Sequence, residues 1–337
     1  MVLLLRKLRN RNPGSYRRLF RSISGGRHRI INYRRLVKMS QYFGFFLKDL
    51  SFSFVILTVG FMLGWIIYNN IILRDVSLKD ALFTKDNLAV WIEFIGAFVF
   101  PVLYLAAHGI KGAVSDNVFV DLAVCIGYTV FYVAILTILR LLSKYIVNLI
   151  NAHDRGGKIC LNKEICEQKN IGAALFSVSL TVIFVSIIKF VDFIDIINGL
   201  GSAILIKILL FLVFMLFAVV CYSLILRRKT TLFKELFLDN NAAAGVGLLG
   251  FVFAVQTIIS GIISVYSMDF DLITVSIVIA ISLIIFGVLS LLFKFLLTKI
   301  IKVDIWNEVY EQDNIGAAIG QVALYVGIAN IIVNFIV

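Results

Sequence analysis

The chain has 337 residues, of which 61% are hydrophobic and only 15% are charged, and its formal net charge is +12. Soluble domains contain about 45–50% apolar residues, so this composition excludes an ordinary soluble domain. Apolar runs of about 20 residues recur along the chain, and a run of that length spans a bilayer as a helix. We therefore expect an all-α polytopic membrane protein.

The basic charge is concentrated in the first 48 residues, which contain 13 Lys and Arg and no acidic residue, whereas the remainder contains 19 Lys and Arg against 20 Asp and Glu. We interpret residues 1–49 as a basic arm that lies on anionic lipid headgroups. Two alternatives stay open. A nucleic-acid contact is disfavoured because the arm has no folded binding motif. A mitochondrial presequence is likewise rich in Arg and poor in acids.

Eight apolar segments follow the arm in chain order, and each is long enough for a transmembrane helix. We expect these helices at about 52–73, 88–110, 118–142, 171–191, 201–226, 242–266, 272–296 and 315–336. The odd-numbered helices are followed by charged linkers and the even-numbered helices by short turns. This alternation indicates a repeating unit of two helices.

An asparagine opens each even-numbered helix, at Asn87, Asn170, Asn241 and Asn314. The intervals are 170 − 87 = 83, 241 − 170 = 71 and 314 − 241 = 73 residues, and a near-constant period of this kind indicates fourfold internal duplication. We assign the extra length of the first interval to an insertion at 151–163. A glutamate precedes three of the four asparagines by six residues, and Ala81 takes that place in the first repeat.

These asparagines are of the residue type that caps a helix. A helix start leaves backbone N–H groups unpaired, which is costly at a membrane boundary, and an Asn side chain accepts hydrogen bonds from them. The small residues that follow let helices approach closely, and we expect this packing role at Gly172, Ala243, Gly247, Gly316 and Gly320. In the alternative interpretation, the capped helix N-termini line a path for an ion or solute.

The segments "EQKNIGAALFSVSL" and "EQDNIGAAIGQVALYVGIANII", with the similar pair "FVFPVLYLAAHGIKGAV" and "FVFAVQTIISGIISV", resemble the DUF350 family of bacterial inner-membrane proteins. The resemblance implies two fused four-helix units, at 50–198 and 199–337, after the arm at 1–49. It implies no established activity. An association of the family with membrane stress favours a role in envelope homeostasis by analogy.

Glu93 is an acid inside a predicted span, six residues past Asn87. The equivalent positions in the other repeats hold Phe176, Gly247 and Gly320. Three interpretations stay open: a shallow acid that reaches water or a linker Lys, a protonated acid bonded across helices, and an ion-contact or coupling acid in the bundle interior. Lys207 also lies a few residues inside a predicted span, and we consider it as the partner of Glu93.

The charges also suggest an orientation. The four linkers contain 16 Lys and Arg, with Arg140 counted as the first charge of the second linker, and the short turns contain two. The positive-inside rule then places the linkers in the cytoplasm and the basic arm outside, whereas the tendency of the first helix to set orientation favours the reverse. We predict cytoplasmic linkers. The expected location is the cell inner membrane, with the mitochondrial inner membrane as the alternative.

The sequence contains few groups that indicate chemistry. Cys160 and Cys166 share a linker with His153, but this spacing is not that of a zinc site, and we expect no metal and no cofactor. No nucleotide-binding or hydrolase motif occurs, so we expect no enzyme. Two classes of function remain: a non-catalytic membrane scaffold that packs against lipid, membrane-protein partners or further copies of itself, and an ion channel or small-solute transporter.

Overall fold

The computed structural model describes residues 47–48, 50–74, 76–109, 117–151, 159–191, 201–226, 230–265 and 271–336. Throughout these residues the regular structure is helical. Eight helices are long and apolar enough to cross a membrane: Leu50–Ile72, Leu88–Ala107, Val118–Asn148, Ile171–Lys189, Gly201–Leu226, Ala242–Val265, Leu272–Ile300 and Ile315–Ile336. The predicted all-α class and the count of eight spans are confirmed.

The chain forms two compact units, 1–55 and 56–337. In the first unit the described residues are helical, and Ser51 Oγ donates a hydrogen bond to the Leu47 carbonyl at 2.7 Å. The basic arm up to residue 46 lies outside the described residues. The remaining description concerns the second unit.

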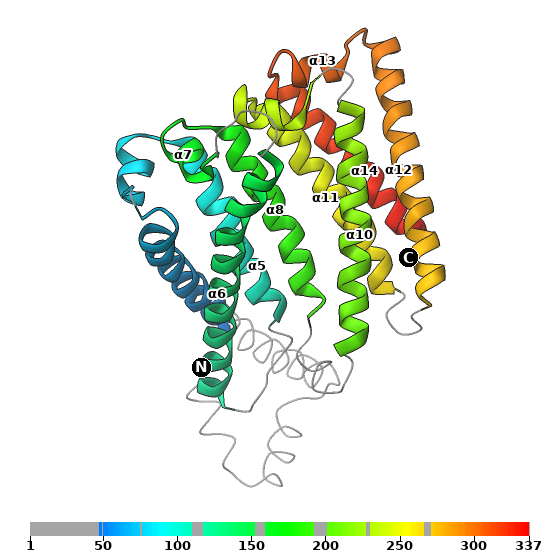
Figure 1. Ribbon diagram of the computed structural model, residues 1–337. Coiled ribbons are helices and arrows are strands. Elements are labelled where there is room, and N and C mark those ends of the chain that lie inside the picture. The colour runs from blue at the N-terminus through cyan, green and yellow to red at the C-terminus, as the bar shows by residue number, and fades with distance from the viewer. Residues whose placement is uncertain are drawn as a thin grey trace, which may run out of the picture. The chain divides into compact units, whose positions relative to one another are not determined.

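The second unit contains long helices and short helical turns in alternation (Figure 1). The first span ends in the π-helix η1 (Tyr68–Ile72), and the second consists of α4 (Leu88–Ile92), η3 (Glu93–Val99) and α5 (Phe100–Gly109). The other long helices are α6 (Val118–Asn151), α8 (Ile171–Lys189), α10 (Gly201–Leu226), α11 (Ala242–Val265), α12 (Leu272–Ile300) and α14 (Ile315–Ile336). The short elements are η2 (Asp80–Thr84), α7 (Leu161–Cys166), η4 (Lys234–Leu238) and α13 (Ile305–Tyr310).

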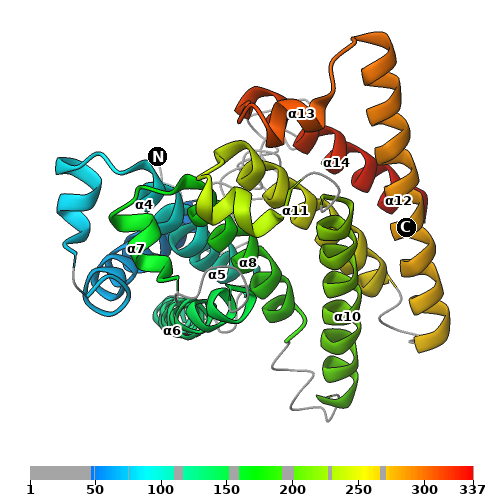
Figure 2. The same cartoon turned by 45° about the horizontal axis from the view of Figure 1, so that its top comes forward.

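The four even-numbered spans lie beside one another in a row. In chain order they are α4–η3–α5, α8, α11 and α14, and each packs against the next. The odd-numbered spans flank this row: α6 contacts α5 and α8, α10 contacts α11, and α12 contacts α11 and α14 (Figure 2). The two middle members of the row, α8 and α11, are the most buried of the eight spans.

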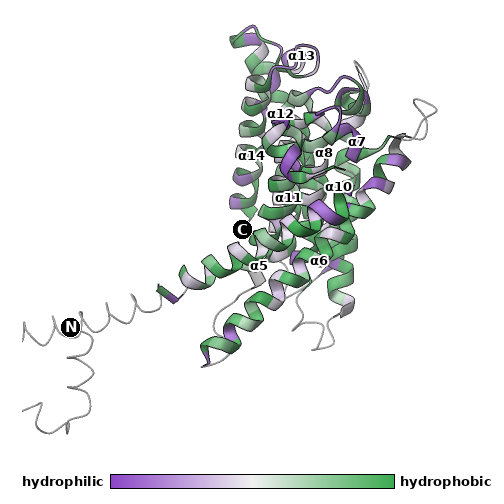
Figure 3. Ribbon diagram, turned by 90° about the vertical axis from the view of Figure 1, so that its left-hand side faces the viewer, coloured by the Kyte–Doolittle hydropathy of each residue, from purple (hydrophilic) through white to green (hydrophobic). Residues whose placement is uncertain are grey.

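Polar residues gather at the end of the bundle that holds α7 and α13, whereas the long helices are mostly hydrophobic (Figure 3). This separation matches a membrane domain with polar linkers at one face, because the hydrocarbon core accepts apolar side chains and intrahelical hydrogen bonds.

The turn before each helix of the row has the same geometry. The residue before each asparagine has a positive φ, at Asp86 (45°), Lys169 (54°), Asn240 (52°) and Asp313 (50°). Each asparagine N–H then donates to the carbonyl six residues earlier, at 3.0 Å for Asn87 and Asn170 and 2.9 Å for Asn241 and Asn314. Positive φ is uncommon outside glycine, so four such residues at one repeat position are a structural signature of the duplication.

Two predicted span boundaries are wrong. The third helix was expected to end at 142 but continues as α6 to Asn151, and the seventh continues as α12 to Ile300 rather than 296. Arg140 suggested the start of a linker, but its side chain is buried and paired within the fold, so its charge does not end the helix.

The small residues that were predicted to pack helices fall into a buried group and an exposed group. Gly172 lies at a close helix contact, because an added Cβ would stand 2.8 Å from the Leu236 carbonyl oxygen. Ala243 is also fully buried. Gly316 and Gly320 are exposed, and the expectation that they pack helices within this chain is wrong. A Cβ added at either glycine would have no atom of another described helix within 4 Å. This side of α14 lies at the end of the row.

Candidate functional site

Glu93 lies at the junction of α4 and η3 and is fully buried. The π-helical segment that it begins ends at Val99, two residues before Pro101, which lacks a backbone N–H and crowds the carbonyl four residues earlier. Tyr68 likewise begins the π-helix η1. A π-helical segment therefore begins at each of the two residues, Tyr68 and Glu93, that contact each other in this site.

Three side chains from three other spans bind the Glu93 carboxylate. Arg140 Nε of α6 lies 2.5 Å from Oε1, and Ser177 Oγ of α8 donates to the same oxygen at 3.0 Å. The Tyr68 hydroxyl donates to Oε2. All four residues are at most 5% exposed, so the site is a buried ion pair in which both carboxylate oxygens accept hydrogen bonds from side chains.

The cluster extends from Arg140 toward the linkers. Arg140 Nη2 donates to Asn162 Oδ1 of α7 at 3.1 Å, and Asn162 Nδ2 donates to the Ile72 carbonyl at 2.6 Å. Arg140 Nη1 also donates to Ser143 Oγ at 3.4 Å. A buried guanidinium needs such partners to offset its lost hydration. The cluster consequently connects η3, α6, α7 and α8 to η1, the end of the first span.

Cys166 stands beside this cluster at the end of α7. Burial, together with the negative charge of Glu93, raises the pKa of its thiol to about 12. The thiol is therefore neutral at physiological pH and is a poor nucleophile and metal ligand. Cys160, six residues earlier, is exposed and free.

The second half of the chain repeats the site's framework with different side chains. Asn87 and Asn241 differ by 241 − 87 = 154 residues, and the side-chain caps of α6 and α12, Asn117 and Asp271, differ by 271 − 117 = 154. The same offset takes Tyr68 to Tyr222, Glu93 to Gly247 and Arg140 to Lys294. After the insertion the offset is 314 − 170 = 144, which takes Ser177 to Gln321 and Cys166 to Tyr310.

Of these equivalent residues, Tyr222, Gly247, Tyr310 and Gln321 lie together, without an ion pair among them. The Tyr222 and Tyr310 hydroxyls are hydrogen-bonded to each other, and Gln321 Nε2 donates to the Tyr325 hydroxyl at 2.7 Å. An added Cβ at Gly247 would stand 3.2 Å from Gln321 Oε1. Burial raises the pKa of Tyr310. The second cluster is therefore neutral where the first is charged.

The model of the family described as Domain of Unknown Function (DUF350) matches residues 195–336. We refer to residues 195–336 as the DUF350 domain on the basis of this match. The resemblance found in the sequence is confirmed for this part of the chain. No curated protein and no solved structure matches the chain significantly. That the preceding segment, 50–198, is a second unit of the same kind stays a prediction.

The predicted asparagines lie at the helix starts both in the DUF350 domain and before it. The side-chain oxygen of each accepts from a backbone N–H two or three residues later: Ala89 and Val90 for Asn87, Ala173 for Asn170, Ala244 for Asn241 and Ala317 for Asn314. Three of them, all except Asn314, are nearly or fully buried.

Two of the asparagines also join neighbouring repeats. Asn87 Nδ2 donates to the Ile165 and Cys166 carbonyls at 2.8 and 3.1 Å. In the DUF350 domain, Asn241 Nδ2 donates at 3.1 Å to the carbonyl of Val309, the residue equivalent to Ile165. The glutamates six residues before Asn170, Asn241 and Asn314 accept from those amides at 3.3, 2.8 and 2.9 Å, which accounts for their recurrence in the sequence.

The structure gives Glu93 a different partner from the one considered in the sequence. Lys207 is half-buried on α10 and forms no ion pair with Glu93, whose cation is Arg140. Arg140 was missed because it was counted as a linker charge. The signal that could have found it is the apolar pattern that resumes after it, in "LLSKYIVNLI".

Within the part of the chain that the structure describes, no group of three His, Cys, Asp or Glu could hold a metal ion. His153, considered with the linker cysteines, lies outside the described residues.

Proposed function

We propose that this protein is a non-catalytic membrane scaffold of the cell inner membrane, with a role in envelope homeostasis. The observation that carries the proposal is that the Glu93 carboxylate is fully bonded within the protein. Both carboxylate oxygens are bonded to side chains from three other spans, and the residue is fully buried. A group that exchanges ions with water needs free coordination, whereas a group that fastens helices is satisfied by the protein itself.

The links between repeats support the same proposal. Asn87 connects the first repeat to the second, the Ile171 N–H donates to Asn240 Oδ1 at 2.9 Å, and the Ala243 N–H donates to Asp313 Oδ1 at 2.8 Å. Each link joins a helix start to the turn of a neighbouring repeat. Such links fix the linker ends of the four row helices relative to one another, as a scaffold requires.

The second candidate is a channel or transporter for an ion or small solute. One observation favours it: Glu93 and Arg140 are ionisable groups buried inside a membrane domain, and such groups often mark an ion path. In this alternative the asparagine-capped helices and Glu93 line that path.

Flux through purified protein in liposomes separates the two candidates. We would measure Na⁺, K⁺, Cl⁻ and H⁺ flux for the wild type and for the double variant Glu93→Leu/Arg140→Met, which removes both charges and keeps the volume filled. We expect flux equal to that of protein-free liposomes, with an added ionophore as the positive control. Flux in the wild type, whether or not the double variant abolishes it, would overturn the scaffold proposal.

A further inference from the structure

A cavity of about 290 Å³ lies in the DUF350 domain, between α10, α11, α12 and α14. Ligand pockets in proteins start at about 300 Å³, so this cavity has the size of a small ligand site or of one segment of a larger ligand. Its walls are almost entirely hydrocarbon and aromatic, and no charged side chain lines it.

Small residues on α12 create the cavity. An added Cβ at Gly287 would meet no atom within 4 Å, and Ser290 lies one turn further along the same wall. The offset of 154 residues takes these positions to Val133 and Leu136 in the first half, where the side chains are only 1% and 2% exposed. The first half therefore holds branched side chains at the two positions that leave space in the second.

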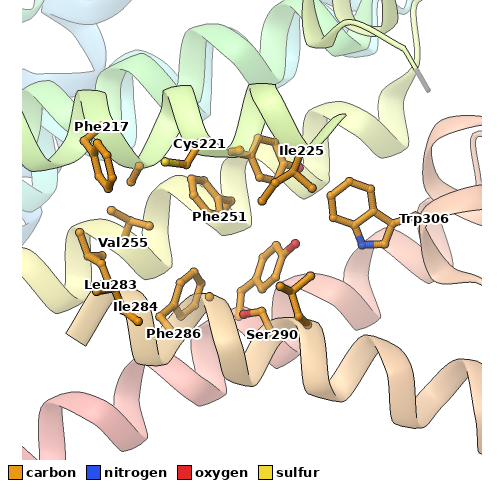
Figure 4. A pocket seen from close by; sticks show the side chains of 15 residues that line it. Phe217, Cys221, Ile225, Phe251, Val255, Leu283, Ile284, Phe286, Ser290 and Trp306 are labelled. Atoms are coloured by element: carbon orange, nitrogen blue, oxygen red, sulfur yellow. The ribbon is translucent and has the colours of Figure 1, made fainter. Parts of the chain in front are cut away.

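The cavity has a polar end and an apolar end. Trp306 lies at one end, Phe217 and Leu283 lie at the other, and Ser290 lies between them, past Phe286 in the direction of Trp306 (Figure 4). Ser290 Oγ is buried and has no hydrogen-bond partner. Lys294, one turn past Ser290, places its Nζ 4.3 Å from the centre of the Trp306 ring, so the polar end is also the end nearest the charged linker.

The cavity opens toward the surface that faces lipid. Ile284 and Phe217 line it and are also 64% and 59% exposed on the outer faces of α12 and α10. A ligand consequently enters from the bilayer. Water is a poor occupant, because apolar cavities of this kind stay dry.

We propose that this cavity binds the acyl chain of a lipid, with the carbonyl oxygen of its ester or acid group accepting a hydrogen bond from Ser290 Oγ. The chain runs from the carbonyl near Trp306 toward Phe217 and Leu283. This orientation places the carbonyl at the linker side of the bundle and the chain at membrane depth, as a bilayer lipid arranges them. The inference is independent of whether the protein is a scaffold or a transporter.

Quenching of Trp306 tests the proposal. The chain has three tryptophans, so the background Trp65→Phe/Trp91→Phe leaves Trp306 as the sole emitter. We would titrate the delipidated protein in detergent with phosphatidylcholine or with stearic acid, each brominated on the chain. The filled variant Gly287→Val/Ser290→Leu installs the side chains of the first half. Gly127→Val is the matched control, because Gly127 is exposed and an added Cβ there meets nothing within 4 Å.

We expect quenching that saturates near one lipid per chain in the background and in Gly127→Val, and that is lost in the filled variant. Saturation by phosphatidylcholine identifies a phospholipid chain, and saturation by the brominated acid alone identifies a free fatty acid. Equal quenching of the filled and open proteins, or no saturable quenching by either probe, would overturn the proposal.

A third variant keeps the test decisive if the filled variant does not fold. Ser290→Ala leaves the cavity open and removes only the hydroxyl. We expect it to weaken binding about 3- to 10-fold, the usual effect of one hydrogen bond. Unchanged affinity in Ser290→Ala would overturn the assigned role of Ser290.

Discussion

At the scale of single residues, the buried Glu93–Arg140 ion pair links the second and third spans in the first half of the fold. Moving a charge into a dry interior is costly, and the cost is offset only when the opposite charge and hydrogen-bonding partners occupy the remaining positions. Tyr68, Ser177 and Asn162 supply those partners. Because Arg140 is its buried partner, we expect Glu93→Gln, like any loss of one of the two charges, to destabilise the protein.

The ion pair gives the first prediction. Arg140→Met leaves the Glu93 carboxylate buried without a cation, and we expect a loss of about 3–5 kcal/mol in unfolding free energy. The double variant Glu93→Leu/Arg140→Met should recover most of that loss, because a hydrophobic pair carries no desolvation cost. Thermal unfolding of the purified proteins in detergent measures both. A double variant no more stable than Arg140→Met would contradict the account of the pair.

The two linker cysteines should differ in reactivity. Cys160 is exposed, whereas Cys166 is buried and its pKa is raised to about 12 by burial and by the Glu93 charge. Because the thiolate is the reactive species, we expect N-ethylmaleimide at pH 8 to modify Cys160 at least tenfold faster, by the standard dependence of rate on thiolate fraction. Peptide mass spectrometry over a time course measures the two rates, with Cys160→Ser as the control. Equal rates would show that the thiol of Cys166 is accessible and ionisable.

At the scale of elements, each repeat is built around one turn and one capped helix. The turn needs a residue with positive φ, a carbonyl six residues back for the asparagine N–H, and an amide that caps the helix. These requirements are local, so the sequence pattern marks all four turns. What differs between repeats is where the amide N–H₂ group donates.

That difference predicts unequal effects of removing the asparagines. Asn314→Ala loses a cap on an exposed turn, and we expect a loss of about 1 kcal/mol. Asn87→Ala also leaves the Ile165 and Cys166 carbonyls without their donor, and we expect about 2–3 kcal/mol. Thermal unfolding in detergent compares the two variants. Equal losses would mean that the link between the first and second repeats adds nothing to stability.

The glycines of the row give a further comparison. An added Cβ at Gly250 of α11 would stand 2.3 Å from Val322 of α14, which forces the two helices apart. Gly320 of α14 has no atom within 4 Å of an added Cβ. We expect Gly250→Ala to lower the unfolding temperature by several degrees, as overpacking of about 1–3 kcal/mol does, and Gly320→Ala to leave it unchanged or raise it. The reverse order would contradict the packing of α11 on α14.

At the scale of the whole molecule, all four repeats point the same way, because each contains two spans. The turns and short helices η2, α7, η4 and α13 consequently belong to one face of the membrane domain, and the polar residues gather there (Figure 3). The flanking helices α10 and α12 stand apart enough to leave the cavity, while α6 is fastened to the row by Arg140.

Orientation in the membrane gives the last prediction. The excess of Lys and Arg in the linkers predicts that this face is cytoplasmic. A cysteine introduced in the 299–307 linker should therefore resist an impermeant thiol reagent added to intact cells, and one in the 192–198 turn should react. The protein with all four native cysteines replaced by serine provides the background. Labelling of the linker from outside would reverse the orientation.

The sequence by itself determined the helical class, the eight spans, the period and the four asparagine turns, because apolar length, capping and turn geometry act over a few neighbouring residues. It also carried the DUF350 resemblance in 195–336. It placed Glu93 inside a span but left its partner open. It placed Gly316 and Gly320 at helix contacts, although their side of α14 is exposed.

Only the tertiary structure decided the pairing of Glu93 with Arg140, 47 residues away, and the existence of the cavity. An ion pair depends on which faces of which helices meet, and in a mostly apolar chain the hydrophobic pattern is similar on every face, so it does not specify them. A cavity depends on the absence of side chains at facing positions of several helices. Gly287 and Ser290 line a cavity only because α10, α11 and α14 surround them in the folded protein.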